Sequence, residues 1–87
     1  MGLSNDGTVV KIELVGREGC HLCADAELVL AQVCREFEVD YTALSIDEDP
    51  QLADLYWERI PVLLIDGEVF DFWRINEQRL RERLSGD

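Results

Sequence analysis

The chain is 87 residues long, which leaves room for one domain with a modest core. Its 19 acidic and 8 basic side chains give a formal net charge of −11, which argues against nucleic acids and anionic membranes as partners, because their phosphates require Lys and Arg. Hydrophobic residues make up 47% of the sequence, but no apolar run is long enough to span a bilayer. Three cysteines, an odd number, do not suit a secreted disulfide framework, so we expect a reducing, cytoplasmic location.

The first half of the sequence predicts a strand, a helix and a second strand. Residues 1–7 are expected to form a flexible leader to a single domain over residues 8–87. The segment 8–15 is β-rich and predicts a strand. Helical spacing then continues to about residue 38, and it is set by Leu22, Ala26, Val29, Leu30, Val33 and Phe37. Alternation over 41–46 predicts the second strand, which should run parallel to the first with a right-handed crossover.

The middle of the chain predicts a short helix followed by a hairpin. Asp49 is placed as the N-cap of a helix over about 50–57, whose first position is a proline. The apolar run 62–65 suits a central strand. Asp66-Gly67 is a strong two-residue hairpin signal, and 68–72 is the expected return strand.

The chain ends in a last predicted helix. Asn76 is expected to cap it, with Ile75 and Leu80 forming a hydrophobic staple. Leu84 shares the inner face of this helix, and Gly86 stands just beyond its end. The predicted order is therefore βαβ-α-ββα, an α/β domain without repeats or linkers.

A pair of cysteines lies between the first predicted strand and the long predicted helix, where the helix begins. Cys20 and Cys23 are three residues apart, so both sulfurs lie on one face within reach of a disulfide. The free N–H groups and partial positive charge of a helix N-terminus favour thiolate over thiol. We therefore expect Cys20 to ionise readily and act as the nucleophile, with Cys23 less exposed and acting as the resolving thiol. The structural alternative is a pair of small buried hydrophobic residues.

Charged neighbours are expected to tune this pair. His21 lies between the cysteines, where an imidazolium would stabilise a thiolate, although a solvated turn residue is an equal interpretation. Arg17 lies three residues before Cys20 and can add positive charge. Glu18 opposes both of these effects.

Metal binding is the rival chemistry for the pair. Cys20, Cys23 and His21 do not supply the four ligands of a tetrahedral site by themselves. Cys34 is about three helical turns beyond Cys23, which is too far to complete such a site. We therefore expect no metal ligands within one chain, and we expect Cys34 to be a core residue.

Over about residues 8–84 the sequence resembles the glutaredoxin family, and especially its short bacterial glutaredoxin-like members. The shared motifs are Gly19-Cys20-His21-Leu22-Cys23, Ile60-Pro61 and Phe72-Trp73-Arg74. The resemblance implies a thioredoxin fold: a four-stranded mixed sheet in the order 2-1-3-4, with helices on both faces. It also implies that Pro61 is cis and lies against the cysteines.

The resemblance also implies where a substrate would bind. The backbone of Ile60 would pair with the substrate chain by strand addition, and Arg17 and Arg59 would meet the glycine carboxylate of glutathione. At the γ-glutamyl end the family has Gly-Gly, whereas this sequence has Asp71-Phe72. Phe72 adds bulk and Asp71 adds like charge there, so we expect weak dependence on glutathione.

Two tryptophans near these motifs have two interpretations. Trp57 and Trp73 can either form a binding surface or pack against the faces of a small domain, and packing is the expected outcome. Arg74 would then be a stacked or ion-paired neighbour of the aromatic side chains.

The function implied is that of a thiol–disulfide oxidoreductase, with Cys20 and Cys23 as catalytic residues and Arg17, His21, Arg59, Ile60 and Pro61 as substrate-binding residues. We expect a monomer without a tightly bound cofactor. Its substrate would be a disulfide-containing protein or a small thiol, and its electron donor would be glutathione or a thioredoxin reductase-type system. The alternatives are a non-enzymatic interaction module that uses the cysteines as a redox sensor, and a dimer bridged by a cluster or zinc through Cys20.

Overall fold

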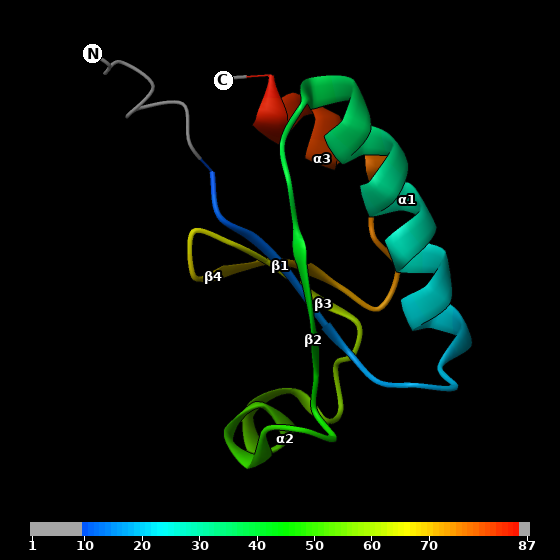
Figure 1. The fold of residues 1–87 in the computed structure, drawn as a ribbon, viewed down its shortest axis with the longest axis vertical. Coiled ribbons are helices and arrows are strands. Elements are labelled where there is room, and N and C mark those ends of the chain that lie inside the picture. Colours follow the sequence, from blue (N-terminus) through cyan, green and yellow to red (C-terminus); the bar gives the residue numbers. More distant parts are fainter. Residues whose placement is uncertain (1–9, 86–87) are drawn as a thin grey trace.

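The computed structural model describes residues 10–85 (Figure 1). The elements follow the predicted order, and they are β1 (Ile12–Gly16), α1 (His21–Phe37), β2 (Thr42–Ser45), α2 (Pro50–Tyr56), β3 (Val62–Ile65), β4 (Glu68–Phe72) and α3 (Glu77–Leu84). No helix within this part of the chain combines the length and apolar character needed to cross a membrane.

The first strand begins later than the predicted 8–15 segment. Lys11 precedes β1 and bonds the hairpin turn instead: its N–H donates to Asp66 Oδ1 at 3.1 Å, and its carbonyl accepts from Asp66 N at 2.8 Å. The start of the predicted strand, the predicted leader 1–7 and Gly86 lie outside the described residues.

The four strands form one mixed sheet in the order β2-β1-β3-β4, as the resemblance implied. β1 pairs with β2 in parallel, so their carboxyl ends meet at one edge, with Gly16 opposite Ser45. β3 is antiparallel to both β1 and β4. The first strand therefore occupies a central position and leads directly into the loop before α1 (Figure 1).

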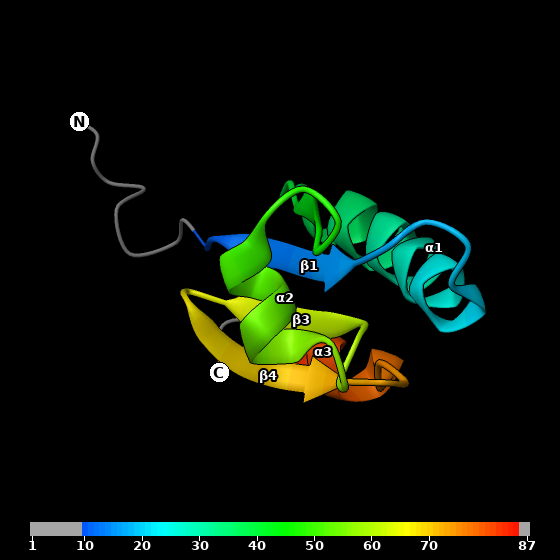
Figure 2. The same cartoon turned by 90° about the horizontal axis from the view of Figure 1, so that it is seen from below.

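Helices cover both faces of the sheet, and the two cores follow from the alternation of side chains along β1 and β3. Leu14 and Leu63 face α1 and α3 in the larger core, whereas Val15 and Leu64 face α2. Figure 1 shows α2 at the opposite end of the view from α3, and Figure 2 shows α2 in front of the sheet with α3 behind it. Because β3 is buried on both faces, its sequence is an unbroken apolar run.

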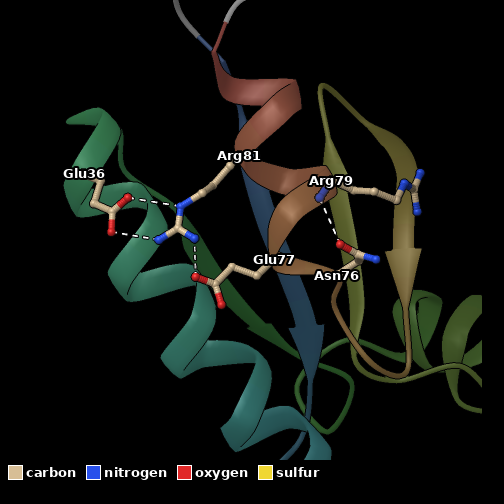
Figure 3. Close-up of polar contacts among 5 residues, drawn as sticks. All are labelled: Glu36, Asn76, Glu77, Arg79 and Arg81. Carbon is tan, nitrogen blue, oxygen red and sulfur yellow. Dashed lines mark hydrogen bonds and ion pairs between the residues drawn. The ribbon is translucent and has the colours of Figure 1, made fainter.

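The predicted start signals are confirmed. Asp49 Oδ1 accepts from Gln51 N at 2.9 Å at the start of α2, and Asn76 Oδ1 accepts from Arg79 N at 2.9 Å at the start of α3 (Figure 3). Asp66 and Gly67 both have positive φ, of 54° and 85°, as a tight hairpin turn requires.

An arginine links the two helices on the larger core. Arg81 of α3 makes a bidentate contact with Glu36 of α1, with its Nε 3.2 Å from Oε1 and an Nη 2.8 Å from Oε2, and it also contacts Glu77 (Figure 3). The hydrogen bonds from Arg81 hold the pKa of the Glu36 carboxyl below its ordinary value. This contact fixes the last turns of α1 beside α3.

Candidate redox site

Cys20 is the N-cap residue of α1. Its backbone is extended, with φ −98° and ψ 116°, and its sulfur accepts a hydrogen bond from the N–H of Cys23 at 3.2 Å. The sulfur therefore stands where an oxygen of Ser or Asp would usually cap a helix, beside unpaired N–H groups. It is also partly exposed, so a substrate can reach it.

Cys23 lies one turn further along and is only 7% exposed. Burial, together with its contact with Cys20, raises the pKa of its thiol to about 11. Its side chain packs against Gly16 at the end of β1, where an added Cβ would lie 2.9 Å from the Cys23 sulfur. The predicted difference in exposure between the two cysteines is confirmed, and Gly16 is what allows the helix to approach the strand so closely.

The Ile60–Pro61 bond is cis, as the resemblance implied, and Pro61 is buried. This loop is fastened to the end of β4 by two hydrogen bonds from one residue. The backbone N–H of Trp73 donates to Pro61 O at 2.8 Å, and its indole Nε1 donates to Glu58 O at 3.1 Å. Trp73 makes both bonds from a left-handed backbone with φ 65°, which is rare for a bulky residue.

The prediction that both tryptophans pack against the domain is wrong. Trp57 is 62% exposed and Trp73 is 54% exposed. Trp57 caps the end of α2, beyond the face that packs on the sheet, and the left-handed backbone of Trp73 turns its ring away from the core. The Trp73 ring meets Phe72 edge-on with centroids 5.0 Å apart, and the Arg59 guanidinium lies 5.7 Å from the Phe72 centroid.

Asp71, in β4, forms hydrogen bonds with the connection between β4 and α3. Its carboxylate accepts from Phe72 N and Asn76 N, both at 2.9 Å, and lies 3.7 Å from a guanidinium nitrogen of Arg79. This charge was expected to oppose the γ-glutamyl end of glutathione, but it is neutralised at the start of α3. Phe72, by contrast, is 36% exposed, and its steric effect on glutathione stays a prediction.

A pocket of about 400 Å³ lies beside the cysteine pair, between the start of α1 and the parallel strands. Of the predicted site residues, Cys20, Cys23 and Arg17 line it. The rest of its lining comes from β1, the loop before α1, the first two turns of α1, the end of β2 and the turn after β2. These lining residues are Leu14, Gly16, Glu18, Gly19, Ala24, Glu27, Ala43, Leu44, Ser45 and Glu48.

The other predicted binding residues lie outside the lining of this pocket. His21 is exposed at the first position of α1, and Ile60 and Pro61 belong to the loop tied to Trp73. The Arg59 guanidinium lies over the Phe72 ring. Sequence reasoning missed the wall from β2, although the parallel pairing of β1 and β2 was a signal for it, since their carboxyl ends must lie side by side.

Cys34 is a core residue, as predicted. It is 3% exposed within the larger core, and burial raises the pKa of its thiol. Within residues 10–85, no cluster of three or more His, Cys, Asp or Glu side chains is arranged to hold a metal ion.

Comparisons with known proteins agree with this geometry. The model of the family described as "Glutaredoxin-like domain (DUF836)" matches residues 11–85. An uncharacterized protein of Mycobacterium tuberculosis is 32% identical over 76 residues, which cover 82% of this chain and 78% of that protein. The X-ray structure of the protein XcR50 from X. campestris is similar, with a TM-score of 0.71 and 32% identity over 87% of this chain and 97% of that one.

The fold itself extends to more distant proteins. The X-ray structure of Fasciola hepatica thioredoxin superposes with a TM-score of 0.66 and 20% identity over 90% of this chain and 80% of that one. The sheet order and the helices on both faces are therefore those of a thioredoxin fold. With the family match spanning nearly all of the described residues, the chain belongs to the glutaredoxin-like domain family (DUF836).

Proposed function

We propose that this protein is a thiol–disulfide oxidoreductase in which Cys20 is the nucleophile and Cys23 the resolving thiol. The observation that carries the proposal is the placement of the two sulfurs. One caps α1 and is open to solvent, and the other is buried one turn behind it. A capping, accessible sulfur is suited to attack, and a buried neighbour in the first turn is suited to release the product.

The first step forms a mixed disulfide. The Cys20 thiolate attacks one sulfur of the substrate disulfide, a new S–S bond forms, and the substrate S–S bond breaks. The departing sulfur takes the electron pair and is protonated by solvent. The N–H groups at the start of α1 support the thiolate before attack, and Arg17, in the same pocket, adds positive charge.

The second step closes the internal disulfide. Cys23 loses its proton and attacks the Cys20 sulfur, and the remaining substrate half leaves as a thiolate that takes up a proton. The substrate has then gained two electrons and the cysteine pair has lost them. A dithiol, two glutathione molecules or a thioredoxin reductase-type system would return these electrons, so that no tightly bound cofactor is required.

The loop before β3 would position an extended substrate. In this proposal the backbone of Ile60 pairs with the substrate chain beside Pro61, and His21 and Arg59 flank the approach. The two bonds from Trp73 to Pro61 O and Glu58 O support this role, because they hold the loop in place.

A turnover assay tests the proposal directly. Reduced protein is supplied with a small neutral disulfide, and glutathione is compared with a thioredoxin reductase system as donor. We expect turnover in the wild type, none in Cys20→Ser, and a trapped mixed disulfide in Cys23→Ser. Cys34→Ala serves as the matched control and should turn over normally, since this cysteine lies in the core.

The interaction-module alternative predicts a different result. In that case the pair would oxidise slowly and stoichiometrically, and no donor would sustain turnover. A disulfide that joins Cys34 to either of the other cysteines would also contradict the proposal.

A further inference from the structure

The pocket beside Cys20 shares its wall with both cysteines, so a small substrate held in it would present its sulfur to the nucleophile. Its volume of about 400 Å³ falls in the range that binds small molecules. Leu14, Ala43 and Leu44 contribute apolar side chains to its lining. Such a pocket accepts a short aliphatic disulfide, and its selectivity then depends on the charges around it.

Those charges are predominantly negative. Glu18, Glu27 and Glu48 line the pocket, and Arg17 is the one basic side chain among its lining residues. The ion pairs formed within residues 10–85 include none of these three glutamates. Their carboxylates are exposed at the rim and remain available to a ligand.

Four of the seven Lys and Arg side chains outside the pocket are paired with acids elsewhere. Arg79, Arg81 and Arg83 of α3 contact acids on β4, on α1 and α3, and in the hairpin turn. Lys11 is paired with Glu13. With three acids and one base among its lining residues, the pocket carries a net negative charge.

We propose that this pocket makes the protein selective for small disulfides that carry an amine close to the sulfur, and that Glu18, Glu27 and Glu48 determine this preference. The inference rests on the proposed function, and it adds the substrate class. An ammonium group within a few bonds of the attacked sulfur would lie near the three carboxylates while its carbon chain contacts the apolar lining residues. An anionic disulfide would instead meet the carboxylates with like charge.

A single-turnover experiment tests the preference without an added donor. Pre-reduced protein is mixed with cystamine, hydroxyethyl disulfide or dithiodipropionate, which are dicationic, neutral and dianionic. Formation of the Cys20–Cys23 disulfide is followed by quenching and mass spectrometry. Each rate is divided by the rate of the same disulfide with dithiothreitol, which removes the intrinsic reactivity of the substrate.

We expect the corrected rates to fall in the order cationic, neutral, anionic. The two extremes should differ on the order of tenfold at low salt, since each exposed charge contributes a few-fold at most. The difference should shrink at about 1 M salt, where exposed charges are screened over a few ångströms. Corrected rates that are equal for the three disulfides would overturn the inference while leaving the proposed function intact.

Charge-removing variants separate the pocket from the whole molecule. Glu27→Gln combined with Glu48→Gln should reduce the cationic preference several-fold. Glu82→Gln is the control, because Glu82 is exposed and belongs to α3, a helix that lies away from the start of α1 (Figure 1). The decrease in preference is compared per charge removed. If Glu82→Gln lowers the preference as much as each pocket substitution does, the net charge of the protein is responsible and the inference is wrong. No reduction of any of the three disulfides would refute the proposed function itself.

Discussion

Two thiols in one helical turn have different environments, and this difference decides their reactivity. Cys20 is an N-cap open to solvent, whereas Cys23 is buried against β1. The pKa of the Cys23 thiol is raised to about 11. Cys23 therefore remains a thiol throughout the neutral range and reacts slowly there.

Alkylation should therefore begin at Cys20. With limiting iodoacetamide near pH 8, we expect Cys20 in the reduced protein to be modified at least about tenfold faster than Cys23, as exposure and thiolate character control the rate. The modification of Cys23 should accelerate only as the pH rises toward 11. Peptide mapping by mass spectrometry gives the two rates, and Cys34 provides a buried reference. Equal rates for Cys20 and Cys23 would contradict the division of roles.

Gly16 is a second residue whose effect can be measured. In Gly16→Ala the new Cβ would lie 2.9 Å from the Cys23 sulfur and 3.2 Å from its Cβ, so the start of α1 must move away from β1. We expect a loss of about 1–3 kcal/mol in the free energy of unfolding, typical of overpacking, together with slower closure of the Cys20–Cys23 disulfide.

Denaturant unfolding and the rate of disulfide closure measure these two effects. Gly67→Asn is the matched control, because nothing lies within 4 Å of a Cβ at this hairpin glycine and Asn tolerates its positive φ. A Gly16→Ala protein with wild-type stability and closure rate would show that the contact is not tight in solution.

At the scale of elements, the end of β4 holds Asp71-Phe72 where the resemblance to glutathione-using glutaredoxins implies Gly-Gly. Asp71 holds the backbone at the start of α3 by accepting from Phe72 N and Asn76 N. Its removal would therefore disturb the start of a helix, whereas the Phe72 side chain contacts only the Trp73 ring and Arg59 among the interactions described, so Phe72 is the better residue to change in a test of ligand access.

We predict weak activity toward glutathionylated substrates, and we expect Phe72→Gly to raise it while Asp71→Gly does not. The Phe72 ring is exposed, and it would add bulk where the resemblance implies that the γ-glutamyl end approaches the backbone. Loss of a charged contact set costs about 1.5–3 kcal/mol, or roughly ten- to a hundredfold in affinity. Deglutathionylation rates, with thermal unfolding of each variant, measure both effects. A wild-type rate equal to that of a Gly-Gly dithiol glutaredoxin would refute the prediction.

Much of the element pattern could be predicted because its signals are local. Asp49, Asn76 and Asp66-Gly67 act within a few residues of their own position, and each was found in its predicted role. The cysteine pair was predictable for the same reason, because the spacing of the cysteines and the signals for the helix start lie in the same short segment.

The features that could not be predicted depend on long-range geometry. The exposure of Trp73 follows from a left-handed backbone that is fixed by bonds to Pro61 O and Glu58 O, and no local signal indicates it. The engagement of Asp71 with Asn76 and Arg79 requires the turn between β4 and α3 to be known. The negative pocket likewise combines residues from β2 and α1.

At the scale of the whole molecule, the net charge of −11 is large for 87 residues. Exposed ion pairs such as those of Lys11 and Arg83 contribute little individually, so repulsion among the excess carboxylates is the larger electrostatic effect on stability. Salt screens this repulsion over a Debye length of about 10 Å at 0.1 M.

We therefore predict that sodium chloride raises the melting temperature. Between about 0.01 and 0.3 M we expect a gain equivalent to roughly 1 kcal/mol, or about 4–8 °C for a domain of this size. Thermal unfolding followed by circular dichroism measures it, and this range precedes the ion-specific effects that grow at molar salt. A melting temperature that falls with salt would mean that the ion pairs outweigh the repulsion.

The N-cap position of Cys20 links the redox state of the pair to the order of α1. In the reduced protein the Cys20 sulfur accepts the Cys23 N–H. A sulfur bonded within a disulfide accepts more weakly than the thiolate that the helix start favours, so oxidation would weaken the cap on the first turn of α1. The amide proton of Cys23 should then exchange with solvent faster in the oxidised protein than in the reduced one. Capping is therefore stronger in the reduced protein than in the oxidised one, and this difference favours the reduced form.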